Sequence, residues 1–291
     1  MRRILIHLAA LVLFLFCAGP VGLSLFASIM PDQAIFSFPP NWFGYKPTAD
    51  NYRYILTGEI PAVYLTAGAN RNMISDAARQ VPAGMLNSAL VAFGVMAVNI
   101  LLGAPAAYSF ARLSFRGRTV SFLAIVMSRL VPAVALVTPF YLLIQAMQLL
   151  GTKSALVIVH SVLTLPFTVL ILTIFFRRIP REIEEAALID GCTRPQVFLK
   201  IVLPLSRNSI FATGIFAFIL SYAEFLFALV LSGDTANRPL SVVMAALARN
   251  TDVSWGLLNA SVFLAVIPTV ALIGIVWRYV VEELLAGGTS Y

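Results

Sequence analysis

A cluster of charged residues interrupts an otherwise apolar chain between positions 179 and 205. Carboxylates and guanidinium groups at this density can form charge-assisted hydrogen bonds to a partner protein. They do not form a catalytic pattern, because the chain contains no H-E-x-x-H, no G-x-S-x-G and no phosphate-binding glycine loop. The segment therefore favours an interaction element over an active site. Its charged residues are Arg181, Glu182, Glu184, Glu185, Asp190, Arg194 and Lys200.

Two further ionisable residues, Arg129 and Glu224, lie inside apolar stretches. At the centre of a membrane span such a side chain costs about 2.5–3.5 kcal/mol unless it pairs, snorkels or faces water. We therefore expect the two side chains to pair with each other or to line a solute path. Tyr222 adds a hydroxyl and an apolar ring face, a combination that suits sugars. The alternative is a structural role for both charges, with the solute bound mainly by another subunit.

Composition places these residues in an all-α polytopic membrane protein. Hydrophobic residues make up 60% of the 291 residues and charged residues only 11%, against about 25% charged in soluble domains. A helix of about 20 apolar residues crosses the hydrocarbon layer, so the length allows about six spans. The net charge of +7 comes from basic residues at span ends and in short loops. This distribution is typical of orientation signals and argues against a nucleic-acid partner.

Apolar runs organise residues 1–291 as a single predicted transmembrane domain. The N-terminal run is longer than the core of a signal peptide, so we expect it to remain as a span. An outer loop covers 31–84 and a cytoplasmic loop covers 177–207. The excess of Lys and Arg on the inner segments predicts that both termini lie in the cytoplasm. The predicted spans are about 4–29, 86–110, 120–143, 157–176, 210–231 and 255–280.

Local signals predict two short helices within the charged segment. Pro180 suits a helix start, and Gly191 can end a helix in the left-handed conformation. Thr193 and Gln196 have the spacing of a capping box, which predicts that a second helix begins there. Pro204 should end or kink that second helix.

The first short helix is predicted to present a face of small residues. Ile183, Ala186, Ala187 and Asp190 are separated by three or four residues, so they lie on one side of a helix that a partner's groove could accept. The alternative is an ordinary connecting loop that is helical.

The spacing of this segment resembles a known signature. The segment contains Glu185-Ala186-Ala187, then Gly191 after three intervening residues, and Ile201-x-Leu203-Pro204 after nine more. This pattern looks like the EAA motif of permease subunits of bacterial ABC importers. The stretches 47–52, 86–88, 106–117 and 224–229 are similar to the carbohydrate-uptake subfamily, which includes the smaller maltose permease subunit. One departure is Ala223, where members of the family commonly carry asparagine.

The resemblance implies the type I importer fold, a location in a bacterial inner membrane and four kinds of partner. These are a second homologous permease, two ATP-binding subunits that hold ATP and Mg, an extracytoplasmic solute-binding protein and the solute. The chain itself would bind no cofactor or metal and would not be an enzyme. By the resemblance, the ATPase-coupling residues are Glu185, Ala186, Ala187, Asp190, Gly191, Ile201, Leu203 and Pro204, and the tail residues Gly287 and Gly288 approach the ATPase dimer.

The expected function is inward passage of a sugar, a polyol or a related sugar-derived solute, including an anionic one. Closure of the ATPase would drive alternating access of the spans. An importer for peptides, amino acids or polyamines is the alternative within the class, because the EAA signature is shared more widely than the sugar-like flanks. An intramembrane enzyme would need a nucleophile and a base within the spans, and a secondary transporter would show repeated halves. The sequence shows neither.

Overall fold

A computed structural model describes residues 2–35, 37–38, 44–60, 76–233, 236–249 and 254–288. Within these ranges the regular elements are helices. Four of the described helices are long and apolar enough to cross a membrane, and the number rises to six if each of two bent helix pairs is one span. The chain forms two compact units, Met1–Met85 with Val242–Thr269 and Leu86–Ser241 with Val270–Tyr291.

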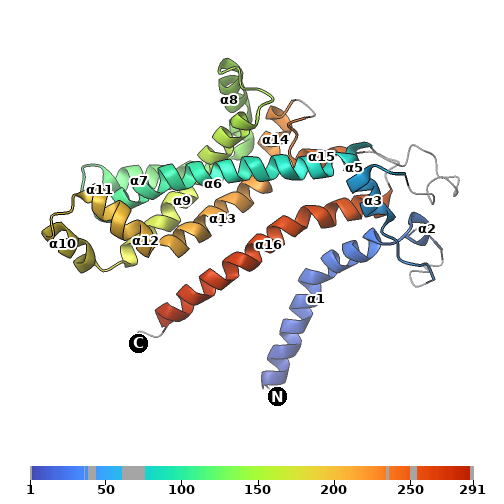
Figure 1. Cartoon of the computed structure of the whole chain (residues 1–291), viewed down its shortest axis with the longest axis horizontal. Helices are drawn as coiled ribbons and strands as arrows, with labels where there is room; N and C mark the ends of the chain where they lie inside the picture. The colour runs from blue at the N-terminus through green and yellow to red at the C-terminus, as the bar shows by residue number, and fades with distance from the viewer. Residues whose placement is uncertain are drawn as a thin grey trace. The chain divides into compact units, whose positions relative to one another are not determined.

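The first unit is built around the C-terminal end of α1 (Arg2–Ser28). Short helices follow α1, and they are α2 (Asp32–Ile35), α3 (Asp50–Thr57) and α5 (Asp76–Arg79) (Figure 1). The Asn51 side chain donates to the Ser28 carbonyl at 2.9 Å, and the hydroxyls of Ser28 and Tyr52 lie 2.6 Å apart. These bonds tie α3 to the end of α1. The Ser24 hydroxyl donates to Asn259 of α16 (Trp255–Gly288) at 2.8 Å.

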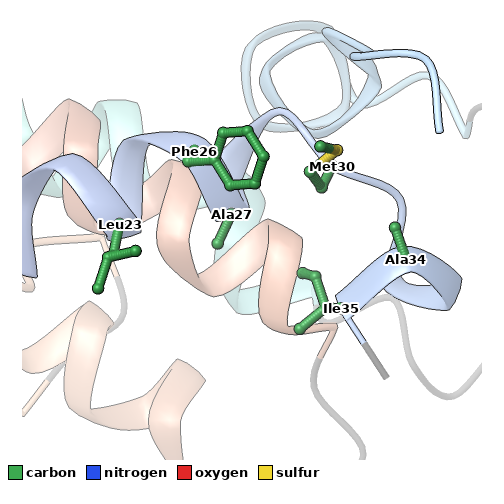
Figure 2. A pocket seen from close by; sticks show the side chains of 6 residues that line it. All are labelled: Leu23, Phe26, Ala27, Met30, Ala34 and Ile35. Atoms are coloured by element: carbon green, nitrogen blue, oxygen red, sulfur yellow. The ribbon is translucent and has the colours of Figure 1, made fainter. Parts of the chain in front are cut away.

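A small apolar pocket lies where α1 meets α2 (Figure 2). Its volume is about 210 Å³. Its lining consists of apolar side chains only, so it offers a solute no hydrogen bond, and it contains none of the predicted site residues. The lining residues are Leu23, Phe26, Ala27, Met30, Ala34 and Ile35.

The second unit packs α6 (Val81–Arg112), α9 (Lys153–Arg178) and α13 (Arg207–Tyr222) together. Glycines allow these helices to approach closely. A Cβ atom on Gly103 of α6 would lie 2.7 Å from Thr168 Cγ2 of α9, and one on Gly214 of α13 would lie 2.8 Å from Ile100 Cδ1 of α6. Because apolar burial gives no net drive in lipid, such close packing is what holds transmembrane helices together.

The third predicted span, 120–143, differs from a single helix. It comprises α7 (Arg118–Met127), the 3₁₀ turn η2 (Ser128–Leu130) and α8 (Ala133–Ala146), with a bend of 101° between the two parts. Pro132 disfavours helical geometry at Val131, which is extended with φ −68° and ψ 124°. The break therefore follows from the proline that the sequence places in this run.

The fifth predicted span, 210–231, is also divided. Helix α13 ends at Tyr222, and α14 (Leu226–Leu231) begins after a break at Ala223, Glu224 and Phe225. A further helix, α15 (Leu240–Ala248), follows between the fifth and sixth predicted spans. The remaining predicted spans, 4–29, 86–110, 157–176 and 255–280, correspond to α1, α6, α9 and α16.

Candidate coupling helix and translocation site

The charged segment begins with α10 (Arg181–Ile189), as the sequence predicts. Pro180 caps its start, and Glu182 and Glu184 lie in its first turn, where the helix dipole favours negative charge. After Asp190, Gly191 adopts a left-handed φ of +88° and turns the chain away from the helix axis. This conformation favours glycine because it has no Cβ.

The second predicted helix begins where the capping box places it. Thr193 precedes α11 (Arg194–Val197), and its backbone N–H donates to Gln196 Oε1 at 2.7 Å. The helix then widens into a π-helical turn, η3 (Phe198–Val202), and ends in α12 (Leu203–Leu205). A 79° bend separates the run Arg194–Leu205 from α13. The bend lies at Ser206, two residues beyond Pro204.

The predicted small-residue face of α10 is partly exposed and partly buried. Ala186 and Asp190 are exposed and Ile183 is 41% exposed, but Ala187 is only 7% exposed and packs into a cluster with Ala104, Ala107, Leu172 and Phe176. Ala187 therefore anchors α10 to the bundle, which corrects its assignment to the docking face. Of the predicted coupling residues in the first part of the segment, Glu185, Ala186, Asp190 and Gly191 remain open to a partner.

The later residues of the motif also divide into supporting and exposed positions. Ile201 and Leu203 are half-buried and pack against the same cluster as Ala187, whereas Pro204 is exposed. A Cβ atom on Gly191 would have no atom within 4 Å in this chain. The space around Gly191 is therefore open for a partner, and the constraint on the residue within the chain is its positive φ.

A buried ion pair beneath α10 was missed by the sequence reasoning. Glu184 Oε1 lies 2.6 Å from Arg112 Nε at the end of α6, and the two side chains are 4% and 5% exposed. The Tyr108 hydroxyl donates to Glu184 Oε2 at 2.9 Å. Arg112 also donates from Nη2 to the carbonyl of Ile179, the residue that ends α9. Removing one member of such a buried pair costs about 3–5 kcal/mol because the other charge is left uncompensated.

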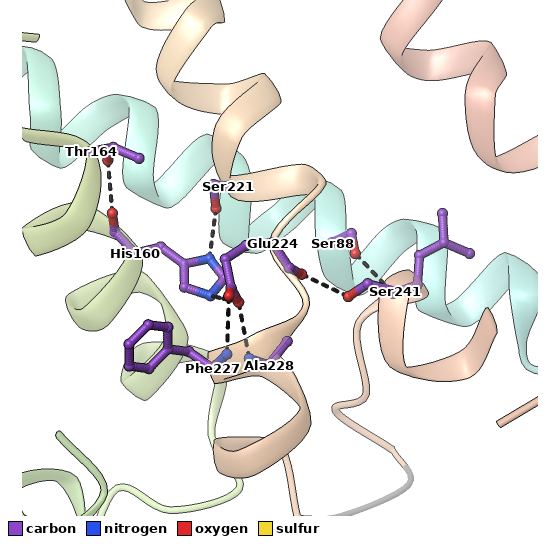
Figure 3. Close-up of polar contacts among 9 residues, drawn as sticks. Ser88, His160, Thr164, Ser221, Glu224, Phe227, Ala228 and Ser241 are labelled. Carbon is purple, nitrogen blue, oxygen red and sulfur yellow. Dashed lines mark hydrogen bonds and ion pairs between the residues drawn. The ribbon is translucent and has the colours of Figure 1, made fainter. Parts of the chain in front are cut away.

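Glu224 occupies the break between α13 and α14, where its carboxylate is fully engaged (Figure 3). It accepts the backbone N–H groups of Phe227 and Ala228, each at 3.0 Å, and so caps the start of α14. Its Oε2 also lies 3.1 Å from Nε2 of His160 in α9. The side chain is 17% exposed. The break in the fifth span is therefore stabilised by Glu224 itself.

His160 joins this site to a line of buried polar residues, which the sequence reasoning also missed. Its Nδ1 lies 2.9 Å from the Ser221 hydroxyl, and its carbonyl accepts the Thr164 hydroxyl at 2.8 Å (Figure 3). The Asn99 side chain of α6 donates to Thr164 at 2.5 Å. The sequence shows several polar residues within apolar runs, which indicates buried polar contacts. It does not show which residues pair, because His160 and Ser221 lie 61 positions apart.

Arg129 lies at the bend between α7 and α8, in the 3₁₀ turn η2, and contacts α9. Its Nη1 donates to the Leu163 carbonyl of α9 at 2.8 Å, and its guanidinium lies 4.6 Å from the centre of the Phe167 ring. Pro166 lies within α9 between these two contact residues. Of the two alternatives for Arg129 and Glu224, pairing with each other is not what the structure shows, because each has a different partner. A place on the solute path stays a prediction for both residues.

Tyr222 ends α13 and is 6% exposed. Its ring stacks on Phe218 with a centroid distance of 5.7 Å and an interplanar angle of 14°. Its hydroxyl is buried and has no hydrogen-bond partner among the residues that the structure describes. A buried hydroxyl without a partner is destabilising, so this group is available to a molecule that the chain alone does not contain.

The predicted tail residues Gly287 and Gly288 lie in the last turn of α16, which extends beyond the predicted span to Gly288. Residues 289–291 lie outside the described ranges.

Comparison with known proteins matches residues 99–282 to the family described as binding-protein-dependent transport system inner membrane component. The matched range contains α10, the Glu184–Arg112 pair and the Glu224 break. The chain is 32% identical to the sulfoquinovosyl glycerol transport system permease protein of Agrobacterium fabrum, over 91% of this chain and 86% of that one. It is 28% identical to the trehalose/maltose transport system permease protein of Thermococcus litoralis, over 99% and 96% of the two chains.

A solved structure supports the fold. With a TM-score of 0.73 and 19% identity, the chain resembles a chain from the crystal structure of a bacterial ABC transporter involved in the import of the acidic polysaccharide alginate, and the match covers 95% of this chain and 96% of that one. The all-α permease fold of type I ABC importers predicted from the sequence is thus confirmed. The chain belongs to the family of binding-protein-dependent transport system inner membrane components, and it is a permease subunit of an ABC transporter, a transport component and not an enzyme.

Proposed function

We propose that this chain carries a sugar-derived solute inward as one permease subunit of an ATP-driven importer, and that α10 couples it to an ATP-binding subunit. The observation that carries the coupling proposal is the position of α10. It exposes Glu185, Ala186 and Asp190, while Glu184 and Ala187 on its other side hold it to the bundle. A short helix with small exposed side chains fits a groove on a partner protein.

The solute class follows from the named relatives. The relatives from Agrobacterium fabrum and Thermococcus litoralis are named for sulfoquinovosyl glycerol and for trehalose and maltose, and a third relative is named for diacetylchitobiose uptake in Streptomyces coelicolor, at 25% identity over 99% of this chain and 97% of that one. These names favour a sugar-derived solute over peptides, amino acids or polyamines. Tyr222 is the candidate solute contact in this chain, because its ring is apolar and its buried hydroxyl has no hydrogen-bond partner within the described ranges.

The proposed assembly contains a second homologous permease, two ATP-binding subunits and an extracytoplasmic solute-binding protein. ATP and Mg would be held by the ATP-binding subunits, with no cofactor on this chain. Both termini would lie in the cytoplasm, on the same side as α10 and the tail residues Gly287 and Gly288. Closure of the ATP-binding subunits would move α10 and switch the spans between two arrangements.

The coupling proposal is tested with two exposed small residues on predicted cytoplasmic segments, Ala186 of α10 and Ser114 of the loop after α6. In the reconstituted complex, Ala186→Trp should block the groove on the ATP-binding subunit and lower solute-driven transport by about tenfold or more. Ser114→Trp adds the same bulk elsewhere and should leave transport near the wild-type rate. Copurification of the ATP-binding subunits should fall for Ala186→Trp alone. Wild-type transport and copurification for Ala186→Trp would exclude α10 as the docking element.

A further inference from the structure

The two ends of α10 are joined to the bundle by non-helical backbone. At its start, Ile179 and Pro180 are extended, with ψ angles of 128° and 134°. At its end, Gly191 is left-handed, and α11 begins only after Thr193. A change in the direction of α10 could therefore be absorbed by rotation at these joints. For a movement of α10 to reach the spans, side chains of α10 must contact the bundle directly.

The side chains beneath α10 provide such contacts. Glu184 projects from α10 and engages two residues of α6 that are one helical turn apart, with its Oε1 2.6 Å from Arg112 Nε and its Oε2 accepting the Tyr108 hydroxyl at 2.9 Å. Arg112 in turn donates to the carbonyl of Ile179 at the end of α9. One carboxylate and one guanidinium thus connect α10, α6 and α9.

The chemistry of this contact differs from that of the apolar cluster around Ala187. Apolar packing is non-directional, because burial depends on the area covered and not on the orientation of a bond. A buried carboxylate that pairs with a guanidinium and accepts a hydroxyl is directional, and any displacement separates charges that water cannot reach. Buried ion pairs often add little net stability. This pair is better explained by its role in holding α10 in one position on α6 and α9.

We propose that Glu184 and Arg112, with Tyr108 as the second donor, form the rigid link through which movement of α10 reaches α6 and α9. Glu184 and Arg112 are then positioning residues for coupling, and they do not touch the ATP-binding subunit. The inference rests on the proposed docking of α10. It adds that docking alone does not move the spans when this buried link is absent.

The test measures solute transported per ATP hydrolysed by the complete reconstituted complex. Glu184→Gln and Arg112→Gln should each lower this ratio about tenfold. The double variant should lower it by about the same factor, because both changes break one link and their effects are then not additive. Glu182→Gln, an exposed acid on the same helix, is the matched control and should keep the wild-type ratio. A wild-type ratio in the single variants, or losses that multiply in the double variant, would overturn the proposal.

In the single variants, one buried charge is left unpaired, and the subunit could then fail to accumulate in the membrane. A second double variant avoids this problem. Arg112→Met combined with Glu184→Leu replaces the pair by apolar contact of similar volume, which buried pairs commonly tolerate. This variant should assemble, copurify with the ATP-binding subunits and hydrolyse ATP, yet transport about tenfold less solute per ATP. A wild-type ratio here would contradict the link. Copurification distinguishes the two proposals, because the docking proposal fails if Ala186→Trp leaves copurification intact, whatever the buried pair does.

Discussion

Helix α10 and the break in the fifth span use acidic residues in opposite ways. On α10, Glu184 is buried and Glu185, its neighbour in sequence, is exposed, so one acid supports the helix while the other is open to a partner. At the break, a single acid, Glu224, caps α14 and contacts His160. Both of its carboxylate oxygens therefore have partners within the chain. An acid in an apolar sequence therefore indicates a partner, and only the fold decides whether that partner is internal.

The largest expected effect comes from Glu224. Glu224→Ala removes two backbone caps and the contact to His160 together, so we expect a loss of at least about 2 kcal/mol in the free energy of unfolding. Glu185→Ala is the control, since it removes an exposed acid and should change stability by less than about 0.5 kcal/mol. The measurement is the unfolding midpoint of the purified subunit in detergent. Equal stability of the two variants would show that Glu224 is not structural.

A smaller effect is expected at Arg129. Arg129→Gln loses the bond to the Leu163 carbonyl and the contact with the Phe167 ring, and should lower stability by about 1–2 kcal/mol. The solute dependence of transport should be unchanged, because the guanidinium is occupied by α9. A selective loss of transport for anionic solutes, with stability intact, would instead return Arg129 to the solute path.

The smallest effect on stability is expected at Tyr222. Tyr222→Phe keeps the stack on Phe218 and removes a buried hydroxyl without a partner, so unfolding should be unchanged or slightly harder. If the hydroxyl binds the solute, the transport rate should fall about three- to tenfold, the value of one hydrogen bond. Wild-type transport by this variant would mean that the solute contacts lie in the partner permease.

Local features of this chain could be predicted from the sequence and distant pairs could not. The ends of α10 and the start of α11 depend on Pro180, Gly191, Thr193 and Gln196, each of which acts within four residues of its own position. The break of the third span at Pro132 has the same local cause.

The pairs that determine the two sites join residues far apart in the chain. Tyr108 and Glu184 are 76 positions apart, and Arg129 and Leu163 are 34 positions apart. Which face of α10 is buried depends on these contacts, so helical spacing alone grouped Ala187 with Ala186. The partner of Arg129 is hidden for the same reason, because no local spacing indicates a bond to the Leu163 carbonyl.

Two neighbouring alanines, Ala186 and Ala187, test directly whether α10 docks on an ATP-binding subunit through its exposed side. In a background carrying Cys17→Ala and Cys192→Ala, Ala186→Cys and Ala187→Cys would each be treated with a short thiol cross-linker in the assembled complex. Ala186 is exposed and Ala187 is 7% exposed. A cross-link to the ATP-binding subunit from Ala186→Cys, and none from Ala187→Cys, is the predicted result. No cross-link from Ala186→Cys, or equal yields from both variants, would contradict the claim.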